Sequence, residues 1–120
     1  MTEIDYHNNL ISSIDSWFRN RFHDSVDWFD HEKRIGTGSV DIYVRSVGGL
    51  FYAFECKYIR RKWKSCDVYG AIGQILWYIS ESKRSGVLLD RAVLVCNIPP
   101  PKDFYNVVDD NRLPIDVEVI

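Results

Sequence analysis

A short run at residues 91–97, Arg-Ala-Val-Leu-Val-Cys-Asn, limits the possible folds of this chain more than any other segment. Almost wholly apolar runs of this length are typical of strands covered on both faces, because a strand with one solvated face alternates apolar and polar residues. Such a sheet needs helices to cover it. The sequence therefore predicts an α/β protein in which helices flank a mixed sheet.

The rest of the chain alternates between helical and strand-like spacing of its apolar residues. Residues 4–22 place them three and four apart, which predicts one amphipathic helix that Thr2 can cap. Without internal repeats or linkers, and with 46% hydrophobic residues, residues 1–120 are expected to form a single domain. The other predicted elements are strands at 26–32, 39–46 and 50–58, a helix at 68–82, the strand at 91–97, a short helix at 102–108 and an edge strand at 115–120.

The second and third strands should form a hairpin, and the length of its loop decides which residues face one another. A three-residue loop at 47–49, with Gly49 in a left-handed conformation, would place Asp41 opposite Glu55. A two-residue loop would instead place Asp41 opposite Cys56, and the sequence does not decide between the two registers.

The three-residue loop would also sort the side chains of this hairpin onto two faces of the sheet. The apolar face is expected to belong to the core and the other face to carry chemistry. The apolar face would hold Val40, Ile42, Val44, Tyr52, Phe54 and Cys56, and the other face Asp41, Tyr43, Ala53, Glu55 and Lys57.

Charge, apolar runs and cysteine usage exclude several classes of protein. Fifteen Lys and Arg against 17 Asp and Glu give a net charge of -2, so nucleic-acid binding would need a local basic patch. No apolar run approaches the roughly 20 residues of a membrane span, and the acidic start Met-Thr-Glu-Ile-Asp predicts a cytoplasmic protein without a secretory signal. Three cysteines without a Cys-x-x-Cys pair indicate neither a disulfide framework nor a zinc or iron–sulfur site, and Cys56 and Cys96 are expected in the core.

Asp41 and the segment Glu55-Cys56-Lys57 form the most informative group of polar residues. Carboxylates on neighbouring strands can bind part of the octahedron of Mg²⁺, and the backbone carbonyl of Cys56 could supply a third oxygen. Lys57 shares the face of Glu55, where its ammonium could orient an attacking water or stabilise charge on a phosphate. A turn-proximal acid beside a cross-strand ion pair would explain each residue singly, but their combination favours a site.

In order and spacing, these residues resemble the PD-(D/E)XK nuclease superfamily, whose restriction-endonuclease-like core is a helix, three antiparallel strands, a helix and a strand. The match covers roughly residues 3–97. The resemblance implies that Asp41 and Glu55 are ligands of Mg²⁺ or Mn²⁺ and that Lys57 is the catalytic lysine. Val40 stands where the name of the motif has proline.

Gln74 and Tyr78 look like the Gln-x-x-x-Tyr motif of RecB-type and related members of this superfamily. Their i, i+4 spacing puts both on one flank of the predicted helix. The resemblance implies that Gln74 contacts the metal-activated water or a phosphate and that Tyr78 donates to the substrate backbone. A surface glutamine and a core tyrosine would give the same spacing. Some members also place a glutamate of the first helix beside the metal, for which Glu3 is the candidate, although the helix dipole alone favours an acid there.

A dense basic segment follows the strand that carries Lys57. It contains Trp63 between cations, as expected of a loop that tracks phosphates, although a solvated loop would look alike. The loop before Ser39, Gly36-Thr37-Gly38, could add backbone amides. The expected DNA-binding residues are Arg60, Arg61, Lys62, Lys64 and Ser39.

These features together predict a metal-dependent deoxyribonuclease that hydrolyses phosphodiester bonds, as an endonuclease or exonuclease. Branched DNA is the expected substrate, although a nick, a flap or a duplex end would fit equally. A homodimer is expected, as in the similar archaeal Holliday-junction resolvases, because a short chain leaves no room for a recognition domain. The alternatives are a non-catalytic relative that binds DNA or a protein, and an RNA nuclease. His7, His23 and His31 have no serine or cysteine partner in a recognisable motif, so the sequence gives no support for a histidine-activated nucleophile. His7 is expected to be a helix-face residue.

Overall fold

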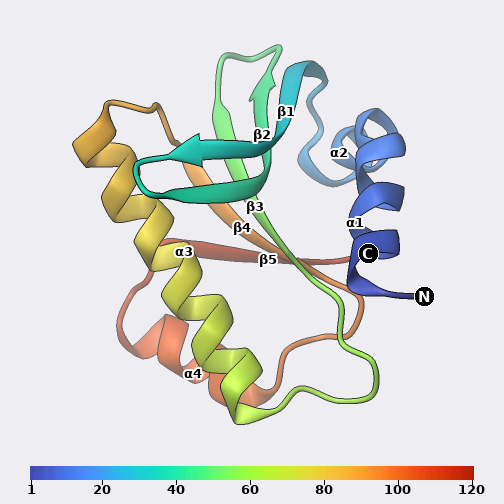
Figure 1. The fold of residues 1–120 in the computed structure, drawn as a ribbon, viewed down its shortest axis with the longest axis vertical. Helices are drawn as coiled ribbons and strands as arrows, with labels where there is room; N and C mark the ends of the chain where they lie inside the picture. The colour runs from blue at the N-terminus through green and yellow to red at the C-terminus, as the bar shows by residue number, and fades with distance from the viewer.

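A five-stranded mixed sheet lies at the centre of the computed structural model, which describes residues 1–120 (Figure 1). The strand order is β1-β2-β3-β4-β5, antiparallel from β1 to β3 and parallel from β3 to β5. The predicted α/β core of a helix, three antiparallel strands, a helix and a strand is confirmed. The elements are α1 (Glu3–Ser12), α2 (Ile14–Phe22), β1 (Val26–Ile35), β2 (Gly38–Ser46), β3 (Phe51–Lys57), α3 (Ser65–Ser85), β4 (Arg91–Cys96), α4 (Lys102–Asp110) and β5 (Ile115–Val119).

Helices cover both faces of the sheet, and β4 contributes to the core on each side. Val93 and Val95 pack in a cluster with α1 and α2, whereas Leu94 and Cys96 pack in a second cluster with α3 and α4. The burial of this strand on both faces, predicted from its apolar run, is confirmed. Figure 1 shows α1 and α2 on one side of the sheet and α3 and α4 on the other. None of the helices combines the length and the apolar character that a membrane span requires.

The single N-terminal helix predicted for residues 4–22 is wrong, because the chain breaks into α1 and α2 at Ser13. The hydroxyl groups of Ser12 and Ser13 donate to the Asn9 carbonyl at 3.0 and 2.8 Å, so side-chain donors compete with the helical backbone. The Trp17 indole N–H donates to the Leu10 carbonyl at 2.9 Å, which ties α2 to α1 across the break. The predicted Thr2 cap of α1 is confirmed.

The β2–β3 hairpin has the three-residue loop, one of the two alternatives that the sequence left open. Arg45 pairs with Phe51, the Ser46 N–H donates to the Leu50 carbonyl at 2.9 Å, and Gly49 has φ of +87°. Continuing this register brings Asp41 opposite Glu55.

The β1–β2 hairpin reaches further than predicted, since β1 runs to Ile35 and its end lies across α3 (Figure 1). Strand β2 bends toward α3 together with β1. This bend changes the predicted assignment of side chains to the two faces of the sheet. Val40 packs not with the α1–α2 side but in a cluster with Tyr43, Ala53 and Tyr78. The face expected only to carry chemistry is therefore also core, with the polar residues at its margin.

Candidate active site

The polar residues meet at a fork where β2 separates from β3. The β2–β3 ladder ends at the pair Ile42 and Phe54, after which β2 follows β1 over α3 while β3 continues beside β4. The Cys56 N–H therefore lacks a backbone partner on β2 and donates instead to the Asp41 carboxylate at 2.8 Å. This bond holds Asp41 against β3.

Cys56 presents its carbonyl oxygen to the same fork. The N–H and C=O groups of one strand residue point to the same side, and the Cys56 N–H points to Asp41 rather than to β4. The carbonyl is thus directed toward the carboxylate pair. Its side chain is buried on the α1–α2 side, as expected of a core cysteine.

Glu55 supplies the second carboxylate and is only 5% exposed. The Tyr78 hydroxyl, which comes from α3, donates to its Oε2 at 2.6 Å. Helix α3 thus positions a side chain of β3.

Two basic side chains, Lys57 and His7, lie beside the carboxylates. Lys57, half-buried at the end of β3, lowers the pKa of both Asp41 and Glu55 through its charge. His7 of α1 approaches the Asp41 carbonyl oxygen with its Nε2 at 3.2 Å, and its charge also lowers the pKa of Asp41. The sequence interpretation of His7 as only a helix-face residue missed this contact. Its only sequence signal is its position four residues after Glu3 on the first helix.

Burial dominates the titration of the two carboxyl groups. Burial raises the pKa of Asp41 above its ordinary value. The Cys56 N–H, His7 and Lys57 lower this pKa, but their effect is smaller. Burial and the neighbouring Asp41 charge raise the pKa of Glu55 to about 8, against the Tyr78 hydroxyl and Lys57. At neutral pH and without a cation, the pair retains a proton.

The donor set fits a hard divalent cation such as Mg²⁺ or Mn²⁺. The buried Glu55 carboxylate, the half-buried Asp41 carboxylate and one carbonyl converge at the fork, and oxygen ligands of this kind suit both ions. No three His, Cys, Asp or Glu side chains gather into a metal-binding cluster. Glu3 in particular stays exposed in the first turn of α1, outside the carboxylate pair, although its charge helps to raise the pKa of the Cys56 thiol.

Gln74 and Ser39 line one hollow of about 380 Å³ between α3 and the start of β2. Tyr78 lines it too, so Gln74 and Tyr78 share a flank of α3, with Gln74 exposed to solvent. The hollow connects these expected site residues with the fork through Tyr78, which contacts Glu55.

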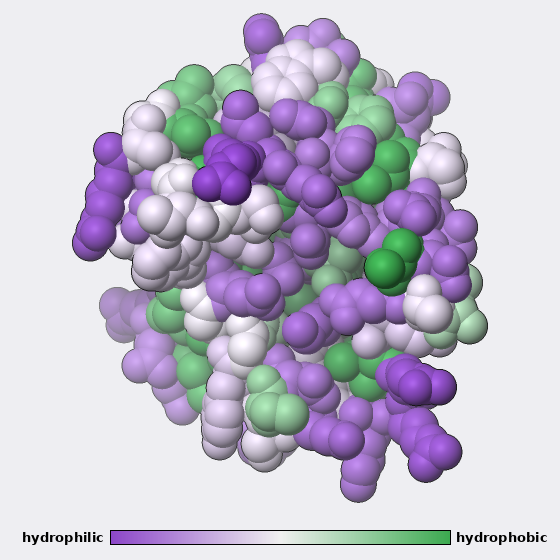
Figure 2. All heavy atoms as spheres, in the orientation of Figure 1, coloured by the Kyte–Doolittle hydropathy of each residue, from purple (hydrophilic) through white to green (hydrophobic).

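The basic segment forms an exposed but anchored loop between β3 and α3. Asn97 accepts from the Ile59 N–H at 2.7 Å and donates to the Ile59 carbonyl at 2.8 Å. Figure 2 shows strongly hydrophilic side chains projecting at lower right, where Figure 1 draws this loop. A hollow of about 940 Å³ here, which we call the basic hollow, is lined by side chains that include Arg60, Arg61, Lys62 and Lys64.

Comparison with known proteins identifies the fold. No family model and no curated protein matches the chain. A repair endonuclease from Pyrococcus abyssi is 17% identical with a TM-score of 0.60, and the alignment covers 91% of this chain and 46% of that one. The EndoMS–dsDNA2 complex is 19% identical with a TM-score of 0.55, and the alignment covers 90% of this chain and 44% of that one. Protein VC1899 from Vibrio cholerae is 16% identical with a TM-score of 0.51, and the alignment covers 88% of this chain and 27% of that one. The chain thus has the fold of these proteins and spans less than half the length of each.

Proposed function

We propose that this domain is a metal-dependent deoxyribonuclease of the PD-(D/E)XK superfamily. The observation that carries the proposal is the fork, where Asp41 and Glu55 meet in a buried setting beside Lys57. A desolvated carboxylate pair with a raised pKa costs the fold stability, and such pairs are typical of active sites. The fold shared with two endonucleases supports the same proposal.

In the proposed mechanism, Asp41, Glu55 and the Cys56 carbonyl would hold Mg²⁺ or Mn²⁺. The cation would polarise the phosphate and lower the pKa of water. Lys57 stabilises the charge that develops on the phosphate. Tyr78 fixes the Glu55 carboxylate through its hydroxyl, a positioning role in addition to the substrate contact that the resemblance implies.

DNA is the proposed substrate, since the basic loop supplies four exposed cations and the EndoMS structure is a complex with double-stranded DNA. Branched DNA and a homodimer are part of the proposal. One fork provides one carboxylate pair, so cutting two strands together calls for two copies of the domain. Sedimentation at several concentrations with and without a four-way junction tests the dimer, and a monomer in every sample would contradict it.

Cleavage of labelled substrates tests the proposed function. Linear duplex, single-stranded, flap and four-way-junction DNA, and RNA, are incubated with Mg²⁺, Mn²⁺ or EDTA. We expect metal-dependent cutting of DNA by the wild type and by Lys83→Ala, whose charge is exposed at the far end of α3, and none by Lys57→Ala.

Three results would change the assignment. Cutting of RNA alone would identify a ribonuclease. Binding of DNA without cutting under all conditions would identify a non-catalytic relative. Undiminished cutting by Lys57→Ala, with its fold verified by circular dichroism, would show that this fork is not the active site.

A further inference from the structure

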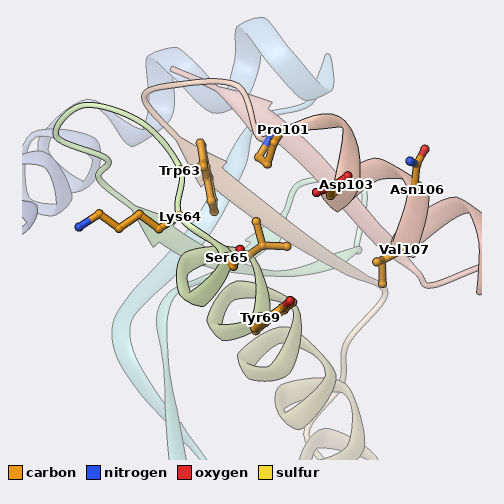
Figure 3. A pocket seen from close by; sticks show the side chains of 9 residues that line it. Trp63, Lys64, Ser65, Tyr69, Pro101, Asp103, Asn106 and Val107 are labelled. Carbon is orange, nitrogen blue, oxygen red and sulfur yellow. The ribbon is translucent and has the colours of Figure 1, made fainter.

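A hollow of about 400 Å³ lies between the N-terminal parts of α3 and α4, away from the carboxylate pair (Figure 3). Trp63, Lys64 and Tyr69 border it on the α3 side, and Asp103, Asn106 and Val107 face them from α4. We call it the aromatic hollow. It combines flat apolar surfaces with a few polar groups, as sites for small planar ligands do.

The two aromatic side chains differ in the number of contacts that hold them. Trp63 is fixed, because its indole N–H donates to the Ile98 carbonyl at 2.8 Å and its ring lies 6.2 Å from that of Phe104. Tyr69 is 71% exposed and makes no aromatic pair. A rigid ring beside an exposed one forms a platform on which another ring can stack.

The aromatic hollow adjoins the cationic surface. Lys64 lines both this hollow and the basic hollow, whose other cations are Arg60, Arg61 and Lys62. A surface for a flat ring therefore lies beside a surface for phosphates. A nucleotide presents both kinds of group, a planar base and an anionic phosphate, joined by its sugar.

The α4 side adds hydrogen-bonding groups that a base edge would meet. The Asp103 carboxylate accepts only, when ionised, and the Asn106 amide both donates and accepts. A carboxylate pairs with the exocyclic amino group of cytosine, and asparagine with the amino edge of adenine. Such groups favour bases that carry an amino group over thymine.

We propose that the aromatic hollow binds one unpaired base of a nucleic acid whose phosphates lie over the basic hollow. This inference rests on the proposed function, which supplies the nucleic acid, and it narrows the substrate to nucleic acid with an unpaired nucleotide. A base inside a duplex cannot enter, because both its faces are stacked.

Binding measured by fluorescence anisotropy in EDTA tests this inference without cutting. The probes are a labelled single-stranded dC oligonucleotide, the same length of abasic strand, a dT oligonucleotide and a perfect duplex. Tyr69→Ala removes the exposed ring from a helix that tolerates alanine. Tyr105→Ala is the matched control, since Tyr105 is a 38% exposed tyrosine of α4 outside the hollow.

We expect Tyr69→Ala to weaken binding of the dC strand about tenfold and to leave the abasic strand and the duplex unchanged. Tyr105→Ala should leave all four affinities unchanged. Asp103→Asn should reduce the preference of the wild type for dC over dT.

Equal affinity of Tyr69→Ala and wild type for the dC strand would overturn the inference, even for a protein that cuts DNA. Equally tight binding of abasic and dC strands by the wild type would also overturn the inference, and would indicate that this hollow binds a protein ligand instead. No binding of any probe by the wild type would overturn the inference and the proposed function together.

Discussion

Glu55 is the only charged side chain among the buried residues of the molecule. Burial of an ionised carboxylate costs several kcal/mol unless neighbouring charges and hydrogen bonds offset it. The Tyr78 hydroxyl and Lys57 offset part of this cost, and the raised pKa shows that they do not offset all of it. A divalent cation that displaces the proton would offset the remainder.

The pH dependence of stability in EDTA should report the pKa of Glu55. That pKa is raised from 4.5 to about 8 in the fold, so the folded protein keeps a proton that the unfolded chain loses. Stability should therefore fall as the pH rises from 4.5 to about 8 and then level off, with a slope of up to about 1.4 kcal/mol per pH unit. Urea unfolding at each pH measures the free energy of unfolding.

Glu55→Gln is the control for this pH dependence, because glutamine keeps the shape of the side chain and carries no proton to lose. We expect a flatter profile over the same interval. An identical decline in both proteins would assign the pH dependence to other groups.

Tyr78→Phe should weaken metal binding without removing a ligand. The variant loses the 2.6 Å hydrogen bond that orients Glu55, and loss of such a partner typically reduces metal affinity or activity about 10- to 100-fold. The Mg²⁺ concentration that gives half-maximal cutting should rise accordingly. Tyr43→Phe, which loses a hydroxyl bond to the Leu88 carbonyl, should leave it unchanged. Equal effects of both variants would indicate a general loss of packing.

At the scale of secondary structure, the site depends on β2 leaving β3 at Asp41. The sequence offered the register that brings Asp41 to Glu55 as one of two alternatives, and the structure selects it through the three-residue loop with Gly49 at positive φ. It did not predict the bend of β2, since the bend depends on contact between the β1–β2 turn and α3, far apart in the chain. The contact of His7 was missed for the same reason, because Asp41 lies far from it in the chain. The break of the first helix at Ser13 was missed although it is local, because the apolar spacing does not show the bonds of the Ser12 and Ser13 hydroxyls to the Asn9 carbonyl.

Gly36→Ala should disturb the site from a distance through the β1–β2 turn. Gly36 has φ of +61°, and a Cβ there would collide with the Glu81 carboxylate of α3. A left-handed alanine costs about 1–2 kcal/mol. The Glu81 carboxylate can rotate aside, but the new Cβ would also lie 3.3 Å from the Glu81 Cβ, so the turn and α3 must separate slightly. Unfolding in urea should show the lost stability, and the rate of cutting should fall as Asp41 shifts.

Gly49→Ala separates these two effects. Gly49 has φ of +87° but nothing within 4 Å of an added Cβ. This variant should lose stability from backbone strain and keep its cutting rate relative to the folded fraction. Unchanged cutting by Gly36→Ala would show that the turn does not control Asp41.

For the molecule as a whole, charge is distributed unevenly. The net charge is -2, yet four exposed cations gather on the loop between β3 and α3. The sequence predicted this patch because its residues are contiguous. The two hollows that it borders were not predictable, since Lys64 joins them only after Asn97 and Ile98 anchor the loop.

The salt dependence of DNA binding should locate the electrostatic contact on this loop. Each phosphate contact contributes about -0.7 to the slope of log affinity against log salt for single strands and about -0.9 for duplex DNA. Replacing Arg60 and Arg61 by glutamine should therefore make the slope shallower by roughly 1.4 to 1.8 if each contacts one phosphate. Replacing Lys83 and Arg84, at the other end of α3, removes the same net charge and should leave the slope unchanged. Equal slopes for both double variants would mean that net charge, and not this loop, governs binding.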